Sequence, residues 1–347
     1  METITEKTRE KKAVEAPGDN EDYVIRVEKL KKHFPLKKGF FETLLSREEA
    51  TVKAVDGINF AVKKGEILGL AGESGSGKTT TGRLLVRLVA PTEGSIFFNG
   101  KDITKLTESE VRPLRKEMQI IFQDPFESLD PRMIVKDIIA EPLRVQKIGR
   151  TEGEVEERVK QALVDVEMVP PDEYLFRFPH ELSGGQRQRV AVARAFVLDP
   201  KFVVADEPVS MLDVSIRAEI LNLMVDLVQK KGSTVVFITH DLAVAKHVCD
   251  RIAIMYLGKI MEISSSDKLI DSPLHPYTQA LIAAVPVPDP SYKRTDVISG
   301  EIPSPVNPPP GCRFNTRCPY AHDRCLIEEP ALVEVEADHY AACHLYT

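Results

Sequence analysis

The sequence predicts an α/β fold in which helices cover both faces of a parallel sheet. Short, uniformly apolar runs at 202–205 and 234–239 alternate with a longer stretch of helical spacing at 214–230. Strands that are apolar on both faces are typical of parallel sheets buried between two helical layers. A glycine-rich turn that follows the apolar run 66–71 and precedes the helical stretch 79–89 indicates the same architecture.

The remaining segments can be assigned in chain order. Residues 1–20 carry mixed charges and no apolar core, so we expect a disordered, solvated tail. Residues 124–180 are rich in helix formers, and 150–169 has apolar and charged residues at spacings of three and four, so we expect a helical subdomain there. Further strands are expected at 23–27, 54–62 and 94–99.

The composition excludes several classes of protein. The chain has 347 residues, a formal net charge of -7, 43% hydrophobic and 29% charged residues, which is ordinary for a globular protein with a sizeable core. No apolar run approaches the roughly 20 residues that span a membrane, and residues 1–20 do not resemble a secretory signal. We therefore expect a cytoplasmic protein, and its mild acidity gives no support for nucleic-acid binding.

The C-terminal fifth is built differently from the rest. Twelve of the 24 prolines lie in 273–330, and four of the five cysteines lie in 312–347. Residues 300–311 (GEIPSPVNPPPG) should be largely extended, because proline restricts its own backbone and that of the residue before it. We therefore expect a small irregular unit at this end of the chain.

A phosphate-binding loop is the strongest motif. Residues 72–79 (GESGSGKT) fit G-x-x-x-x-G-K-[ST] between an expected strand and an expected helix, although a plain Gly/Ser turn is the alternative interpretation. Glycines let backbone N–H groups turn toward phosphate oxygens, and the helix N-terminus adds unsatisfied donors. Lys78 would lie against the β- and γ-phosphates, and the Thr79 hydroxyl would bind Mg²⁺. The predicted nucleotide-binding residues of this loop are Gly72, Ser74, Gly75, Ser76, Gly77, Lys78, Thr79 and Thr80.

A second motif supplies carboxylates. Residues 201–208 (KFVVADEP) place Asp206 and Glu207 directly after a short apolar strand. Asp206 would hold Mg²⁺ through water, and Glu207 would polarise an attacking water. Adjacent carboxylates after a strand are often only a solvated loop, but beside a phosphate loop they indicate nucleotide hydrolysis.

The segment 182–186 (LSGGQ), followed by RQRVAVAR, decides the subclass. Here the sequence resembles the ATP-binding subunits of ABC transporters, and the resemblance extends from about residue 23 to 345. Further family elements recur in order, namely IFQDP, DEP, 210–213 (SMLD) and FITHD. The resemblance implies a P-loop NTPase fold of the ABC type, in which two domains pair head to tail and sandwich two ATP molecules. Each phosphate loop would then face the signature of the partner, formed by Leu182, Ser183, Gly184, Gly185 and Gln186.

The resemblance also implies roles for single residues. Gln123 would sense Mg²⁺ and the attacking water, and His240 would contact the γ-phosphate and orient the water with Glu207. Asp213 would lie at the dimer seam. The aromatic residue that stacks on adenine in this family is best matched by Phe34, with core packing as the alternative. The Mg²⁺ ligands would be Thr79, Gln123 and Asp206.

The C-terminal motifs narrow the resemblance further. HPYTQAL, GEIPSPVNPPPGCRF and RCPYAHDRC, together with QDPFESLDPR, resemble the oligopeptide/dipeptide importer ATPases, specifically the second of their two ATPase subunits. This implies an ABC domain over 21–265 and a family-specific extension over 266–347. It also implies a peripheral position at the cytoplasmic face of the membrane, with a second, different ATP-binding subunit, two permease subunits and an external solute-binding protein. Family substrates are mainly di- and oligopeptides, and some relatives carry oligosaccharides or nickel.

Four cysteines of the extension form a candidate metal site. Their spacing, C-x₅-C-x₆-C-x₁₇-C, is a poor match for zinc, and disulfides are disfavoured in a reducing compartment. Four thiolates can hold a [4Fe–4S] cluster, and relatives with this extension resemble cluster proteins. Zinc and unligated or partly oxidised thiols remain alternatives for Cys312, Cys318, Cys325 and Cys343, whereas Cys249 is interpreted as an inert packed thiol.

Other classes of phosphate-loop protein fit less well. ABC ATPases that act on DNA carry long coiled-coil insertions, and the interval between the phosphate loop and LSGGQ has no sustained heptads. Ribosome-associated ABC proteins have two phosphate loops in a chain, and this sequence has one. LSGGQ and His240 disfavour an ordinary kinase or GTPase.

Overall fold

The computed structural model describes all residues except 1–21, 37–50, 125–127, 286–299, 302 and 307. The tail expected over 1–20 therefore lies outside the described residues, as do parts of the expected helical subdomain and extension. Within the described ranges, no helix is long and apolar enough to cross a membrane.

The centre of the molecule is an eight-stranded sheet in the order β11-β12-β10-β9-β3-β8-β7-β6. The five strands from β9 to β6 pair in parallel, and β10, β12 and β11 are added antiparallel. The strands are β3 (Ile67–Ala71), β6 (Met118–Ile121), β7 (Phe202–Asp206), β8 (Thr234–Thr239), β9 (Arg251–Tyr256), β10 (Lys259–Ser265), β11 (Val333–Glu336) and β12 (His339–Ala341).

The central strands are apolar throughout because both faces of the sheet are covered. All residues of β3, β7 and β8 are buried, and successive side chains enter two different cores. Val203 and Val235 pack into one core with the helices that follow the phosphate site, whereas Val204 and Val236 pack into the other with the first helix and a second sheet. The parallel α/β fold expected from the sequence is confirmed.

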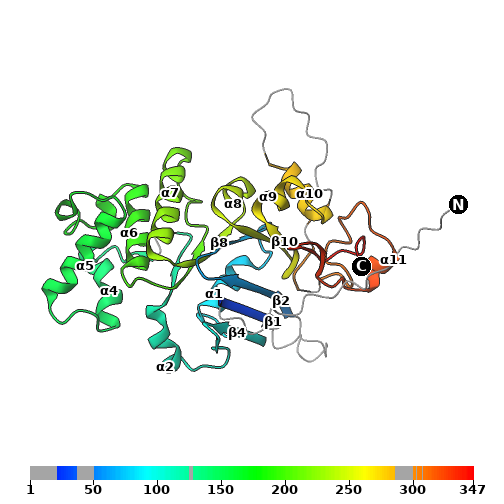
Figure 1. Ribbon diagram of the computed structural model, residues 1–347, viewed down its shortest axis with the longest axis horizontal. Helices are drawn as coiled ribbons and strands as arrows, with labels where there is room; N and C mark the ends of the chain where they lie inside the picture. The colour runs from blue at the N-terminus through cyan, green and yellow to red at the C-terminus, as the bar shows by residue number, and fades with distance from the viewer. Residues whose placement is uncertain (1–21, 37–50, 125–127, 286–299, 302, 307) are drawn as a thin grey trace, which may run out of the picture.

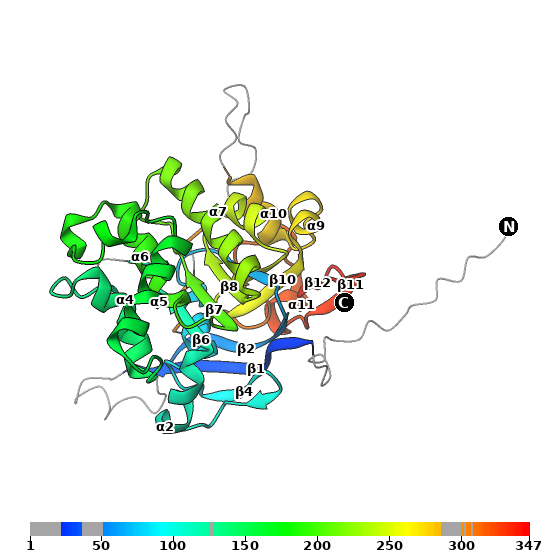
Figure 2. The same ribbon diagram turned by 60° about the vertical axis from the view of Figure 1, so that its left-hand side comes forward.

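The helices lie around this sheet and at one end of it. Figure 1 shows α4, α5 and α6 gathered at one end of the molecule, and Figure 2 shows the same helices from another side. Segment 124–180 contains α4, α5 and a short 3-10 turn over Pro171–Glu173. The helices are α1 (Lys78–Leu85), α2 (Glu108–Val111), α4 (Val135–Val145), α5 (Glu152–Asp165), α6 (Gly184–Phe196), α7 (Val214–Lys231), α8 (Leu242–Val248), α9 (Ser266–Asp271), α10 (Pro276–Ala283) and α11 (Asp323–Ile327).

Helix α1 ends four residues earlier than its periodicity predicts. The helical spacing continues to residue 89, but the helix stops at Leu85, and Arg87 has a left-handed backbone with φ of 55°. The Arg87 guanidinium donates hydrogen bonds to the carbonyls of Ile103 and Leu106, at 2.9 and 3.0 Å. The helix end is also closed locally, because the N–H groups of Arg87 and Leu88 donate to the carbonyls of Leu84 and Arg83, both at 2.9 Å.

A second, antiparallel sheet has the order β2-β1-β4-β5. Its first two strands are longer than expected, because β1 and β2 pair from Tyr23–Lys63 to Pro35–Thr51 with several bulges. This extension carries Phe34 to the edge of the phosphate loop. The strands are β1 (Tyr23–Pro35), β2 (Thr51–Lys63), β4 (Glu93–Phe98) and β5 (Lys101–Asp102).

The C-terminal extension is joined to the main sheet. Strand β12 pairs with β10, and the N–H of Ala342 donates to the carbonyl of Met261 at 2.8 Å. At this junction the buried carboxylate of Glu262 contacts Nε2 of His339 at 2.6 Å. The extension is irregular as expected, but it completes the sheet rather than lying apart from it.

Candidate functional site

Four neighbouring strands end at the candidate site. Strand β3 leads into the phosphate loop, β7 ends at Asp206, β8 is followed by His240, and Gln123 lies two residues after β6. Because these strands are parallel and adjacent, their carboxyl ends meet at one edge of the sheet. The topology therefore brings together motifs that are up to 168 residues apart in the sequence.

The phosphate loop requires glycine at two positions. Gly72 and Gly77 have φ of 146° and 105°, and a Cβ at either would lie 2.2 Å from a backbone oxygen, of Met255 and Ala54 respectively. The Lys78 ammonium is turned into the loop and donates to the Gly72 carbonyl at 2.7 Å. Burial lowers the pKa of Lys78. The loop thus forms a closed ring of backbone around a buried cation, as a polyphosphate site requires.

A hydroxyl and a carboxylate adjoin the loop. The Thr79 hydroxyl donates to Oδ1 of Asp206 at 3.0 Å, and the Asp206 side chain is buried. Burial raises the pKa of Asp206, because its charged form is poorly solvated. Mg²⁺ prefers a few protein oxygens together with water and phosphate oxygens, so this pair is chemically suited to the ion.

One carboxylate oxygen of Glu207 contacts the two other side chains that were predicted as catalytic. Nε2 of Gln123 donates to Oε2 of Glu207 at 3.1 Å, and Nδ1 of His240 lies 3.0 Å from the same oxygen. The Glu207 backbone has φ of 45°, a conformation that costs energy for a non-glycine residue and is typical of functional positions. The three side chains predicted as catalytic therefore converge.

A cavity of about 720 Å³ joins these elements. Phe34 lies in its wall and is 39% exposed, so it is available to a ligand rather than packed in a core. Gly72, Ser76 and Asp206 do not line the cavity: Ser76 and Asp206 are buried, and their side chains contact Lys78 and Thr79, which do line it. The lining residues are Phe34, Val52, Ala54, Ser74, Gly75, Gly77, Lys78, Thr79, Thr80, Gln123, Glu207, His240 and Pro305.

The LSGGQ segment forms a helix start away from this cavity. Ser183 caps α6: its hydroxyl accepts the N–H of Gln186 at 3.2 Å, and Oε1 of Gln186 accepts the N–H of Ser183 at 3.0 Å. Leu182 is buried, and a Cβ on Gly185 would lie 2.7 Å from Ile216, so this glycine permits close packing against α7. Gly184, like the other signature residues, does not line the cavity of its own chain.

Asp213 lies at the exposed start of α7 without capping it through its side chain. Met211 and Val214 beside it are 62% and 80% exposed.

Comparison with known proteins identifies the family. The ABC transporter family model matches residues 55–210, and the model of the oligopeptide/dipeptide transporter C-terminal region matches 261–325. The oligopeptide transport ATP-binding protein AppF of Bacillus subtilis is 48% identical over 332 residues, covering 94% of this chain and 99% of that protein. The chain belongs to the ATP-binding subunits of the oligopeptide/dipeptide ABC transporters.

Solved ABC ATPases share the fold. The ATP-binding cassette MJ0796, solved as a dimer bound to ADP and phosphate, has a TM-score of 0.61 and 27% identity, covering 70% of this chain and 98% of that one. The cbiO1 protein of Clostridium perfringens, part of an ABC transporter complex, has a TM-score of 0.61 and 27% identity, covering 72% and 92%. The subunit is therefore an ABC-type ATPase, and the cavity described above is its candidate nucleotide site.

The four cysteines of this ABC subunit lie near one another as free thiols. Cys312, Cys325 and Cys343 are buried, and the Cys312 N–H donates to the Cys325 carbonyl at 2.9 Å. Burial, with a smaller contribution from the neighbouring thiols, raises the pKa of Cys312 to about 12 and that of Cys343 to about 11. The mutual influence of the thiols, which extends to Cys318, shows that they share one environment.

The arrangement does not match a site for one metal ion. In the described part of the chain, which includes all four thiols, no group of three or more His, Cys, Asp or Glu side chains could hold a metal ion. The described residues therefore show no metal site at the four thiols, neither for zinc nor for an iron-sulfur cluster. The fifth cysteine, Cys249, is buried against Gly69, and burial raises its pKa.

Sequence reasoning missed three contributors to the ATP site, all from the C-terminal extension. Pro305 lines the cavity, and its carbonyl accepts the N–H of Lys53 at 3.1 Å. Arg317 and Tyr277 contact Glu73 within the phosphate loop. No local pattern identifies such contacts, because each partner lies more than 200 residues away in the sequence.

Proposed function

We propose that this ABC subunit hydrolyses ATP to drive the import of di- or oligopeptides through a membrane permease. The observation that carries the ATPase part is the convergence of Lys78, Thr79 and Glu207 at one cavity, with Asp206 bound to the Thr79 hydroxyl. The peptide part is supported by the C-terminal region that matches the oligopeptide/dipeptide transporter family and by the similarity to AppF. Oligosaccharide or nickel import would use the same ATPase chemistry and is an outcome of the test below.

Each side chain of the site has a separate role in ATP hydrolysis. The loop N–H groups and Lys78 bind the phosphates, and Thr79 and Asp206, with Gln123, would hold Mg²⁺. Glu207 takes the proton of the water whose oxygen attacks the γ-phosphorus, as the bond to the ADP oxygen breaks. His240 orients the water through the oxygen of Glu207 that it contacts. Phe34 would stack on adenine from the cavity wall.

The signature supports a two-chain arrangement. None of its five residues lines the cavity of its own chain, yet Ser183 and the glycines present a helix start whose N–H groups suit a phosphate. We propose that it completes the ATP site of a second, different ATP-binding subunit, with Asp213 and its exposed apolar neighbours at the seam.

The helical segment provides a surface for the permease. Val169 and Phe176, in the interval proposed as the helical subdomain, are 60% and 66% exposed. Apolar side chains at this exposure suit contact with the cytoplasmic ends of two permease subunits, which would place the ATPase at the inner face of the membrane. We also propose that the chain divides into an ABC domain over 21–265 and an extension over 266–347.

The test is reconstitution of the assembled transporter in vesicles, with its permease subunits and external binding protein. We expect peptide uptake to require ATP and the binding protein, and peptide-loaded binding protein to stimulate ATP hydrolysis. Uptake of an oligosaccharide or nickel, with no response to peptides, would contradict the peptide assignment alone. Co-purification with ribosomes or DNA, instead of permease subunits, would contradict the transport role.

We further propose that Cys312, Cys318, Cys325 and Cys343 bind a [4Fe–4S] cluster that cross-links the segments of the extension. The proximity of the four free thiols supports it, and ligation would displace their protons. Full-length protein purified without oxygen should contain iron and sulfide, and Cys318→Ser should lose both, whereas Cys249→Ser should retain them. Iron-free protein that is fully folded and active would contradict the proposal.

A further inference from the structure

Glu73 is the acidic side chain of the phosphate loop, and the C-terminal extension holds it. Nη1 of Arg317 donates to Oε2 of Glu73 at 2.8 Å, and Nη2 donates to Oε1 at 3.1 Å. Two parallel hydrogen bonds of this kind fix both the position and the orientation of a carboxylate. The Arg317 side chain is 5% exposed and that of Glu73 is 22% exposed, so solvent screens the pair only weakly.

The backbone of the same residue is held as well. The Glu73 N–H donates to the hydroxyl of Tyr277 at 3.0 Å, and Tyr277 belongs to α10 of the extension. The Glu73 carbonyl accepts from Nζ of Lys78 at 2.9 Å. One residue of the loop therefore connects the extension directly to the lysine that meets the phosphates.

Arg317 is itself held in place before any ligand arrives. Nη1 also donates to the Tyr256 hydroxyl at 3.3 Å, and the guanidinium lies 5.8 and 5.9 Å from the ring centroids of Tyr256 and Phe314. Tyr256, Tyr277 and Phe314 are fully buried and pack together at centroid distances of 4.7 to 5.5 Å. The guanidinium thus extends from a rigid aromatic cluster, and little entropy is lost on pairing with Glu73.

The charge of Glu73 explains why such a contact would matter for ATP. Glu73 does not line the cavity, but its carboxylate belongs to the loop that would bind the triphosphate, and like charges repel one another most strongly where solvent screens them weakly. Since the ligand carries several negative charges, an uncompensated Glu73 would weaken its binding.

We infer that Arg317, which does not line the cavity, is a positioning residue that acts on the ATP site through Glu73. It neutralises Glu73 and holds the phosphate loop in its ATP-binding conformation, so the extension that carries the four cysteines also sets the affinity for ATP. The inference rests on the ATPase function of this site. It gives the C-terminal extension, which lies outside the nucleotide-binding motifs, a role in positioning the phosphate loop for ATP.

The test measures binding of Mg²⁺-AMP-PNP to the full-length chain by calorimetry. We expect Arg317→Gln to weaken binding about tenfold, and Arg317→Lys, which keeps the charge, to weaken it about threefold or less. Glu73→Gln, whose amide oxygen still accepts from Arg317, should bind within about threefold of wild type. The double variant Glu73→Gln/Arg317→Gln should recover to the same range, because the uncompensated charge is gone. Arg324→Gln is the matched control, since Arg324 pairs with Glu328 in two hydrogen bonds on the exposed surface of the same extension.

The double variant separates positioning from mere structural support. If Arg317 only stabilised the extension, Arg317→Gln and the double variant would be equally impaired, and this result would overturn the inference. Binding by Arg317→Gln that equals binding by Arg324→Gln would overturn it as well. If Arg317→Gln does not fold, Arg317→Lys is compared with the double variant. Wild-type-like binding by both supports the inference. A loss of tenfold or more in the double variant contradicts it. Wild-type chain that does not bind the nucleotide would instead contradict the proposed function.

Discussion

The ATP site and the C-terminal extension are held together by different kinds of interaction. In the ATP site, glycine backbones such as those of Gly72 and Gly77 pack directly against neighbouring strands, and the functional groups lie in short contiguous motifs. The extension is instead attached by ion pairs between residues far apart in the sequence. Arg313 contacts Asp56, 257 residues away, and Arg317 contacts Glu73, 244 residues away. Functional residues can therefore lie close together in the sequence, while the residues that hold them in place come from distant parts of the chain.

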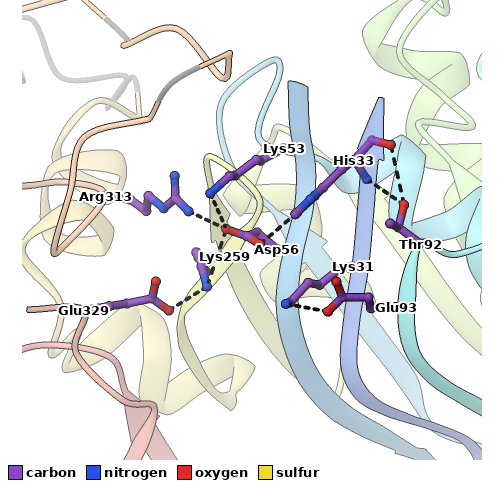
Figure 3. Close-up of polar contacts among 9 residues, drawn as sticks. All are labelled: Lys31, His33, Lys53, Asp56, Thr92, Glu93, Lys259, Arg313 and Glu329. Atoms are coloured by element: carbon purple, nitrogen blue, oxygen red, sulfur yellow. Dashed lines mark hydrogen bonds and ion pairs between the residues drawn. The ribbon is translucent and has the colours of Figure 1, made fainter. Parts of the chain in front are cut away.

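The two regions meet around Asp56 of β2. Figure 3 shows Asp56 approached by Arg313 and Lys259 from one side and by His33 from the other. His33 precedes Phe34, and its Nε2 lies 2.9 Å from Oδ1 of Asp56. The extension therefore adjoins both the strand that carries the proposed adenine contact and the phosphate loop. The following predictions test whether the regions can be separated experimentally.

The largest effect is expected at the chemical step. Glu207→Gln should reduce ATP turnover by about 10²- to 10⁴-fold while nucleotide binding stays intact, because a general base is lost but the phosphate contacts remain. The measurement is steady-state ATPase activity in the assembled transporter, with nucleotide affinity measured in parallel. Glu181→Gln, at an exposed position before the signature, is the control. Undiminished turnover would remove Glu207 from its role.

The next effect concerns stability and separates the extension from the ATPase core. Asp56→Asn should lower the free energy of unfolding by about 3 kcal/mol, since it leaves the buried Arg313 guanidinium without its counter-charge. Urea titration measures the change. Asp271→Asn, which removes an exposed partner of Lys246, should cost about 0.5 kcal/mol or less. An equal loss in both variants would show that Asp56 contributes no more than a surface ion pair.

The same carboxylate predicts a dependence on pH. Burial acts to raise the pKa of Asp56, but the charges of Lys259, Arg313 and Lys53 and the hydrogen bond with His33 outweigh it and lower the pKa below 3.8. A lowered pKa means that the stabilisation is present above about pH 4 and is lost as the pH falls through the folded-state value. Wild type should therefore lose stability below pH 4 more steeply than Asp56→Asn. Parallel stability curves for the two proteins would contradict this.

A loss of comparable free energy is expected for a change in the phosphate loop, but here nucleotide binding is weakened and not the stability of the fold. Lys78→Ala should weaken Mg²⁺-AMP-PNP binding about 100-fold, because the buried cation that faces the phosphates is removed. Lys64→Ala, at an exposed turn, should bind as wild type does. Unchanged affinity in Lys78→Ala would contradict the loop assignment.

The smallest effect is expected at Phe34. Loss of stacking on adenine in Phe34→Ala should weaken nucleotide binding about fivefold, or about 1 kcal/mol. Phe176→Ala, at an exposed site in the helical segment, is the matched control. If Phe34→Ala binds normally, the aromatic residue is only part of the cavity wall.

The elements and motifs of the ATPase could be predicted because their signals are local. The apolar strands β3, β7 and β8 and the spacing of 72–79 depend on periodicity and on backbone conformations that glycine permits. Element ends were less predictable. Helix α1 stops at Leu85 because the chain turns at Arg87, whose left-handed backbone the apolar spacing does not reveal, and β1 extends to Pro35 because β2 pairs with it.

By itself, the sequence predicted which residues would bind phosphate, hold Mg²⁺ and activate water. Those capacities depend on residue type and short spacing, as in Lys78, Thr79 and the pair Asp206–Glu207. Only the tertiary structure decided that Gln123 and His240 meet on one oxygen of Glu207, and that Arg317 holds the phosphate loop. The physical reason is that parallel strand order and long-range charge pairing create neighbours across hundreds of residues, and no local pattern encodes such distances.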